Sequence, residues 1–231
     1  MIAALKAHHR WQETLLLAAL CGLAFGVSLG RAALTHSKMF LFLNWNLFLA
    51  FIPWLISTTI VIKPWLRTSK ILVPVLLALW LLFFPNAPYI LTDLFHLNAG
   101  NKAPVWFDLV LVILFAWTGL LFGFLSLADI EGIFLRKLPR WLVASISSCM
   151  LFVGSFGIYL GRYLRWNSWD ILRDPFKLLD NIGDRIVNPS AYPRTWGMTL
   201  MMGLLLNVMY WSLRLVALRA PPSGEPSVGG R

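Results

Sequence analysis

Six blocks of mostly apolar residues, each about 20 residues long, constrain this chain more than any other feature. A helix of that length crosses a hydrocarbon layer about 30 Å thick, and lipid offers the backbone no other hydrogen-bond partners. The predicted spans cover residues 14–34, 39–62, 71–91, 105–128, 141–160 and 196–218. The expected fold is therefore all-α: one polytopic membrane domain of six helices over residues 1–219. A Pro-, Gly- and Ser-rich tail at 220–231 is expected to be disordered.

The composition supports a membrane protein and argues against a nucleic-acid partner. Hydrophobic residues make up 58% of the chain and charged residues 13%, with a net charge of +10. The basic residues lie mostly between apolar blocks, where they attract anionic headgroups and set orientation. We therefore expect membrane lipids as partners.

The basic residues also predict the orientation. On one side we count only Arg31, near the end of the first span, and Lys38 and Lys102 in the short connections. Eleven lie on the other side, at Lys6, Arg10, Lys63, Arg67, Lys70, Arg136, Lys137, Arg140, Arg214, Arg219 and Arg231. Because basic residues are enriched on the cytoplasmic side, both termini should be cytoplasmic. Six further basic residues in the long fifth connection, 161–195, oppose this orientation, although long connections count less.

Two segments on the predicted extracytoplasmic side are unusually polar and aromatic. The first follows the third span and reads FPNAPYILTDLFHL from residue 84 to 97. Its prolines remove backbone donors and favour a break in the helix. If the helix resumes, Tyr89, Asp93 and His96 share one face at spacings of four and three. Asn86, between the two prolines, can cap the freed backbone.

The second segment follows the fifth span and reads GRYLRWNSWD from residue 161 to 170. It supplies Arg162, Arg165, Asn167 and Asp170. An Asp-Pro pair then predicts a helix over 175–187, with an apolar stripe at Phe176, Leu179, Ile182 and Ile186. Lys177, Asp180, Asp184 and Arg185 should face elsewhere, and the helix should lie in the membrane interface.

A candidate polar site at this membrane boundary unites the two segments. Asp93 and His96 are its candidate acid–base pair. Arg162 and Arg165 are candidate clamps for an anionic group, since guanidinium groups bind phosphate and carboxylate well. The other candidate binding residues are Asn86, Tyr89, Asp108, Asn167 and Asp170. Asp108 enters the fourth span, where an unpaired charge is costly. In an equally good alternative to the clamp role, one of the two arginines pairs with Asp108 and the other extends to the lipid headgroups.

Several glycines and two further acidic residues lead to predictions about structure and not about function. Spacing of four between Gly22, Gly26 and Gly30, between Gly119 and Gly123, and between Gly157 and Gly161 predicts close helix packing or oligomerisation. Asp129 and Glu131 are expected to be solvated charges near Arg136 and Lys137. No nucleotide-binding loop, zinc-protease helix or nucleophile elbow is present, and we predict no bound metal and no cofactor.

The strings FPNAPYxxTDLxHL and GRYxRWNSWD, together with Trp106-Phe107-Asp108, resemble an uncharacterised family of bacterial integral membrane proteins catalogued as a domain of unknown function. The resemblance covers the chain from about the second span to the last. It implies a location in the bacterial inner membrane and implies no activity.

Three functional hypotheses remain open at this point. The leading one is a site that binds or processes an anionic or lipid-linked small molecule, with the question of enzymatic turnover left open. The second is a small transporter or channel, which needs a polar path to the cytoplasm. The third is a non-catalytic assembly subunit whose polar cluster is structural.

Overall fold

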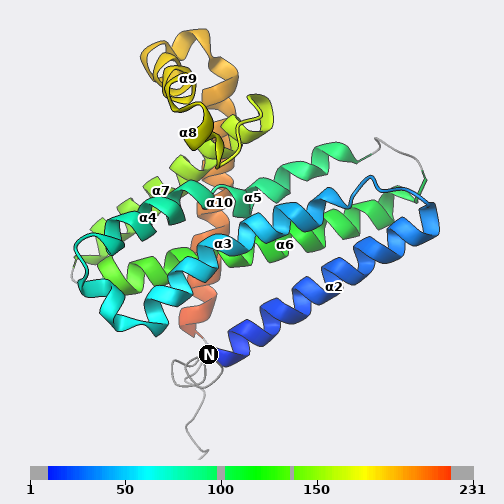
Figure 1. Ribbon diagram of the computed structural model, residues 1–231, viewed down its shortest axis with the longest axis horizontal. Helices are drawn as coiled ribbons and strands as arrows, with labels where there is room; N and C mark the ends of the chain where they lie inside the picture. Colours follow the sequence, from blue (N-terminus) through cyan, green and yellow to red (C-terminus); the bar gives the residue numbers. More distant parts are fainter. Residues whose placement is uncertain (1–9, 98–101, 136–137, 220–231) are drawn as a thin grey trace, which may run out of the picture.

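A computed structural model describes residues 10–97, 102–135 and 138–219, and these residues are mostly helical and carry no strand (Figure 1). The elements follow in the order α2 (Trp11–Thr35), α3 (Phe42–Ile62), η1 (Pro64–Thr68), α4 (Leu72–Phe83), α5 (Asn86–Tyr89), η2 (Ile90–His96), α6 (Val105–Ile130), η3 (Glu131–Leu135), α7 (Arg140–Tyr163), α8 (Asp170–Arg173), α9 (Pro175–Val187), η4 (Pro189–Ala191) and α10 (Pro193–Arg219). The tail predicted at 220–231 lies outside the described residues.

Six of these helical segments are long and apolar enough to cross a membrane. The predicted all-α bundle of six spans is therefore confirmed. Consecutive spans alternate in direction, so the start of α2 and the end of α10 lie at the same end of the bundle, called here the termini end. The connections that contain α8 and α9 lie at the opposite end, called the α8–α9 end (Figure 1).

The third span is longer than predicted, because helical backbone continues past Pro85 and Pro88. After α4 ends, the chain re-enters a helical turn in α5 and then tightens into the 3₁₀ segment η2. The apolar span therefore reaches His96. In a 3₁₀ helix, residues three apart project from the same side, so Asp93 and His96 face one direction.

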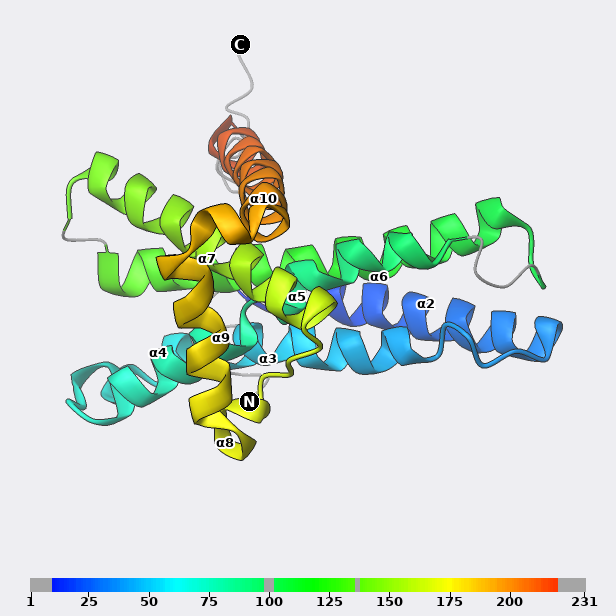
Figure 2. The same ribbon diagram turned by 90° about the horizontal axis from the view of Figure 1, so that it is seen from above.

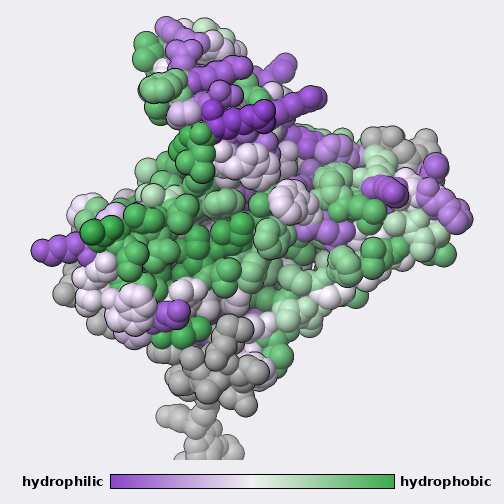
Figure 3. Space-filling model, in the orientation of Figure 1, coloured by the Kyte–Doolittle hydropathy of each residue, from purple (hydrophilic) through white to green (hydrophobic). Residues whose placement is uncertain are grey.

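α6 is the centre of the bundle, with α2, α3, α5 and η2 packed around it. α7 and α10 form a second closely packed pair. α10 runs steeply across the direction of α3 and α6, which is plain when Figure 1 is compared with Figure 2. Hydrophobic residues cover the body of the bundle in Figure 3, as expected of a surface that faces lipid.

Glycines on α6 and α7 leave room for the segment that contains Pro85 and Pro88 to pack closely against both helices. A Cβ at Gly119 would lie 2.7 Å from the carbonyl oxygen of Ala87, and one at Gly157 would lie 2.5 Å from Pro85 Cγ. The close packing predicted for Gly119, Gly123, Gly157 and Gly161 is therefore confirmed. The predicted face on α2 behaves differently: a Cβ at Gly22, Gly26 or Gly30 would meet nothing within 4 Å.

The long fifth connection is folded, and α9 covers the predicted range 175–187. Phe176 and Leu179 are exposed, whereas Arg185 is buried beside the rings of Tyr159 and Tyr192. Arg185 therefore faces away from the exposed side chains of the predicted stripe and toward these two rings. The position of α9 in the membrane interface stays a prediction.

A hydrogen bond ties the end of α9 to the start of α10. Tyr192 Oη donates to Asp184, and this bond, with a second from Asn188 Nδ2, lowers the pKa of the Asp184 carboxyl. Trp196 Nε1 donates to the carbonyl oxygen of Arg185, 3.1 Å away, and adds a further link.

Candidate functional site

Asp93 lies at the junction of three spans at the α8–α9 end. Its side chain is 1% exposed. It accepts hydrogen bonds from Asn46 Nδ2 of α3 at 2.9 Å and from Arg162 Nη1 of α7 at 3.2 Å. A buried carboxylate is stable only when such donors replace water, so Asp93 joins the third span to the second and the fifth.

His96 is the exposed member of this cluster, with 37% of its side chain accessible. Its Nδ1 lies 3.4 Å from Arg162 Nη2 and 3.6 Å from Asp93 Oδ1. Nδ1 therefore lies between a donor, the Arg162 guanidinium, and an acceptor, the Asp93 carboxylate, and its role as acceptor or donor depends on the tautomer. Phe42 packs edge-on against the ring at 5.3 Å, which fixes its orientation.

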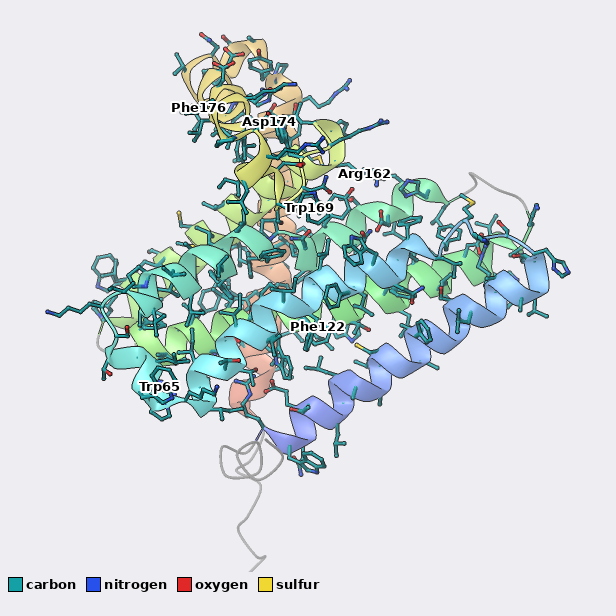
Figure 4. All side chains as sticks on the ribbon, viewed as in Figure 1. Trp65, Phe122, Arg162, Trp169, Asp174 and Phe176 are labelled. Carbon is teal, nitrogen blue, oxygen red and sulfur yellow. The ribbon has the colours of Figure 1, made fainter. Side chains whose placement is uncertain are left out.

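These groups line a cavity of about 450 Å³, called here the polar cavity. Its walls are Phe42, Asn46, Tyr89, Asp93, His96, Gly161, Arg162 and Arg165. Two guanidinium groups face one carboxylate, so the cavity carries an excess positive charge. Arg162 lies near the end of α7 (Figure 4). Its guanidinium lies 5.4 Å from the ring of Phe95 in η2.

Arg165 enters the polar cavity from a left-handed backbone position, with φ of 58°. The α7 helix ends there in a cap in which the Trp166 amide donates to the Leu160 carbonyl oxygen at 3.2 Å. This position usually holds glycine, because a Cβ costs about 1–2 kcal/mol in that conformation. Arg165 therefore holds, at the wall of the polar cavity, a backbone conformation that favours glycine.

A second, apolar cavity of about 580 Å³ adjoins the first and is called here the apolar groove. Asn46, Tyr89 and Gly161 line both. Leu81 and Leu82 of α4, Phe156 and Leu160 of α7, and Leu178 and Ile182 of α9 supply much of its surface.

Asn86 and Asn167 line the apolar groove and not the polar cavity. Asn86 Nδ2 donates to Ser168 Oγ at 2.9 Å, and Ser168 Oγ donates to the Leu82 carbonyl oxygen at 3.0 Å. This chain of hydrogen bonds fastens the loop after α7 to the end of α4.

Asp170 and Asp108 line neither cavity. Asp170 accepts from the Asn167 amide at 2.7 Å and so caps its own turn. Asp108 pairs with Arg31 of α2, whose Nε and Nη2 donate to its two oxygens at 2.5 and 3.0 Å. The alternative in which Arg162 or Arg165 pairs with Asp108 is wrong, because the partner of Asp108 is Arg31 of α2, whose side chain is 1% exposed.

Charges near the termini end are also paired. Asp129 accepts from Arg10 Nη1 and from Ser57 Oγ, each at 2.6 Å. Glu131 is 4% exposed and accepts from Tyr210 Oη at 2.7 Å, with Arg214 Nη2 also 2.7 Å away. The expectation that these two carboxylates are solvated is wrong.

The sequence signal for Asn46 was its place at the start of the second span, on the same side as the two polar segments. Phe42 carried no signal of its own. Among the described residues, no group of three or more His, Cys, Asp or Glu side chains is placed to hold a metal ion.

A comparison with family models matches residues 45–209 to the family described as "Protein of unknown function (DUF1361)". Searches of curated proteins and of solved structures found no match.

Proposed function

The chain belongs to this family of unknown function, and we propose that it is a multi-pass membrane protein that binds an anionic or lipid-linked small molecule in the polar cavity. The observation that carries the proposal is the buried Asp93–Arg162 pair with His96 and Arg165 around an open cavity. Buried charges at the edge of a membrane are costly and are usually paired, functional or both.

The residues divide into ligand-facing and positioning roles. Arg165 and the free face of Arg162 supply donors for an anion, since guanidinium groups form paired hydrogen bonds with phosphate or carboxylate. His96 lines the polar cavity and is the candidate acid or base. Asp93 is buried and holds Arg162 and His96 in place.

We propose that this site lies on the extracytoplasmic side, because the distribution of basic residues predicts cytoplasmic termini. A cysteine at Ser190, in the connection after α9, should react with an impermeant thiol reagent in intact cells, whereas one at Ser69 should not. Each cysteine should be introduced separately into a variant in which Cys21 and Cys149 have been replaced. The reverse labelling pattern would place the site on the cytoplasmic side.

A structural role as an assembly subunit is the second candidate, favoured by the complete pairing of Asp93 with Asn46 and Arg162. It predicts that the cluster stabilises the protein and that no small anion binds there. Binding of inorganic phosphate to the purified protein distinguishes this structural role from the binding role.

The test is stabilisation of the purified protein by inorganic phosphate at constant ionic strength. A ligand that binds only the folded state raises stability by RT ln(1 + [L]/Kd), about 1.4 kcal/mol at ten times Kd. The wild-type melting temperature should rise saturably with phosphate. Arg165→Gln should abolish this response, whereas Arg173→Gln, an exposed arginine of α8 that lines neither cavity, should preserve it.

Equal responses of the wild type and both variants would show that phosphate acts generally on the protein. No saturable response in any of them would leave the structural role as the better account.

A further inference from the structure

The apolar groove continues from the polar cavity toward the middle of the bundle. At its deep end, Val153 lies about 15 Å from the end of α7, at 1.5 Å per residue. Half of a hydrocarbon core about 30 Å thick is also about 15 Å. The groove therefore reaches through about one leaflet, with the polar cavity at its outer end.

The chemistry of the groove changes along this path. Asn46, Asn86, Asn167 and Ser168 line it near the polar cavity. Farther in, the lining is apolar side chains of α4 and α7. A ligand that fits both parts has a polar head and a hydrocarbon tail.

The groove is open to lipid on its flank. Ala78 of α4 and Val153 of α7 line it and are also exposed on the surface. The apolar residues Leu178, Ile182 and Ile186 of α9 cover its outer part. α8 and α9 stand over this end of the bundle in Figure 1, and Figure 3 shows hydrophilic residues gathered over them. A membrane lipid would therefore enter the groove from the surrounding bilayer, through the flank at Ala78 and Val153, with its chain already at the depth of the groove.

We propose that the apolar groove holds a hydrocarbon chain of one membrane lipid whose phosphate-bearing headgroup occupies the polar cavity. This inference rests on the proposed function and names its ligand class. Charge complementarity supports a phosphate head, because Arg162 and Arg165 outnumber the single carboxylate of Asp93.

The groove selects the ligand more by shape than by hydrophobic energy. A chain that leaves the bilayer for the groove moves between two apolar surroundings, so little free energy is gained from burial alone. The headgroup contacts supply the direct affinity, and a chain held in the groove keeps the headgroup beside the polar cavity, so that a water-soluble phosphate without a chain binds more weakly. Filling the groove should therefore exclude the lipid and leave phosphate binding intact.

Native mass spectrometry of the detergent-solubilised protein tests this with three probes. Dioleoylphosphatidic acid has both parts, glycerol 3-phosphate lacks the chains, and dioleoylglycerol lacks the phosphate. We expect one tightly retained phosphatidic acid per protein, with the other two probes bound at least tenfold more weakly.

Ala78→Trp places a ring in the groove without displacing a packed residue, because Ala78 is exposed. It should weaken retention of phosphatidic acid at least tenfold and leave the melting response to inorganic phosphate unchanged. Ala19→Trp, at an exposed position of α2 that lines neither cavity, is the matched control and should behave like the wild type.

The outcomes separate the two proposals. If phosphate binds through Arg165 but Ala78→Trp retains the lipid normally, the chain is not in the groove and this inference fails alone. If all three probes bind equally and Arg165→Gln changes nothing, the proposed function fails as well. Retention of many lipids without preference would show a bulk lipid surface and would overturn the inference.

Discussion

The Asp93–Arg162 pair should contribute measurably to stability, and Asp93→Asn is the sharpest single perturbation of it. The substitution keeps the shape of the side chain but removes the charge that faces Arg162 Nη1 at 3.2 Å. It also changes the acceptor for Asn46 Nδ2 at 2.9 Å. Arg162 would then remain mostly buried, with 15% of its side chain exposed and without its carboxylate.

The expected cost follows from these contacts. Breaking a fully buried ion pair costs about 3–5 kcal/mol, and a hydrogen bond to a charged group is worth about 1.5–3 kcal/mol. The polar cavity gives Arg162 access to water, so we expect about 2–3 kcal/mol for Asp93→Asn. At about 2–4 °C per kcal/mol for a chain of this size, the melting temperature should fall by about 5–10 °C.

A double-mutant cycle on Asp93→Asn and Arg162→Gln, followed by thermal unfolding in detergent, measures the pair itself. The coupling energy should be about 1–3 kcal/mol. His96→Gln is the matched control on the same face of η2. Because His96 is half-exposed, it should change stability by no more than about 0.5 kcal/mol. A shift of the melting temperature in Asp93→Asn no larger than that in His96→Gln, or additive effects of the two substitutions in the cycle, would show that the pair does not stabilise the protein.

Three further predictions concern the scaffold around the site. Arg31→Gln, which removes the partner of a buried carboxylate, should cost about 3–5 kcal/mol in the same unfolding assay; a loss under 1 kcal/mol would contradict the assignment of that pair as structural. Gly119→Ala should destabilise the protein by about 1–3 kcal/mol, because its Cβ would lie 2.7 Å from the Ala87 carbonyl oxygen. Gly26→Ala, with open space around it, should be neutral or stabilising by up to about 1 kcal/mol, and equal effects at the two glycines would refute the packing argument. Arg165→Gly should leave stability unchanged or raise it by about 1 kcal/mol, since glycine suits a φ of 58°. The same substitution should abolish the melting response to phosphate. A large destabilisation would show that Arg165 is a structural residue.

Local patterns in the sequence predicted the spans and α9. The length of each apolar block determines whether it can cross a membrane, and Asp174-Pro175 marks a helix start whatever its surroundings. The meeting of Asp93, His96 and Arg162 was also predictable, because the third and fifth spans both end on that side.

The ion-pair partners of the buried carboxylates were harder to predict, because they depend on how the spans pack. Arg31 was counted as a connection residue, since the end of a span is uncertain by a turn, and its pairing with Asp108 was therefore missed. Asp129 and Glu131 were assigned to solvent for the same reason. Their partners, Arg10 and Arg214, lie in the first and last spans or at their edges, far away in sequence.

Binding of an anionic group in the polar cavity can be followed through the imidazole of His96, which lines that cavity. Nitrogen resonances of ¹⁵N-histidine-labelled protein in detergent can be followed during titration with dioleoylphosphatidic acid, with the His96 signals assigned from His96→Gln. If the headgroup occupies the polar cavity, the His96 resonances alone among the four histidines should shift saturably, and they should not shift in Arg165→Gln. Unchanged His96 resonances at saturating lipid, or equal shifts of all the histidines, would contradict it.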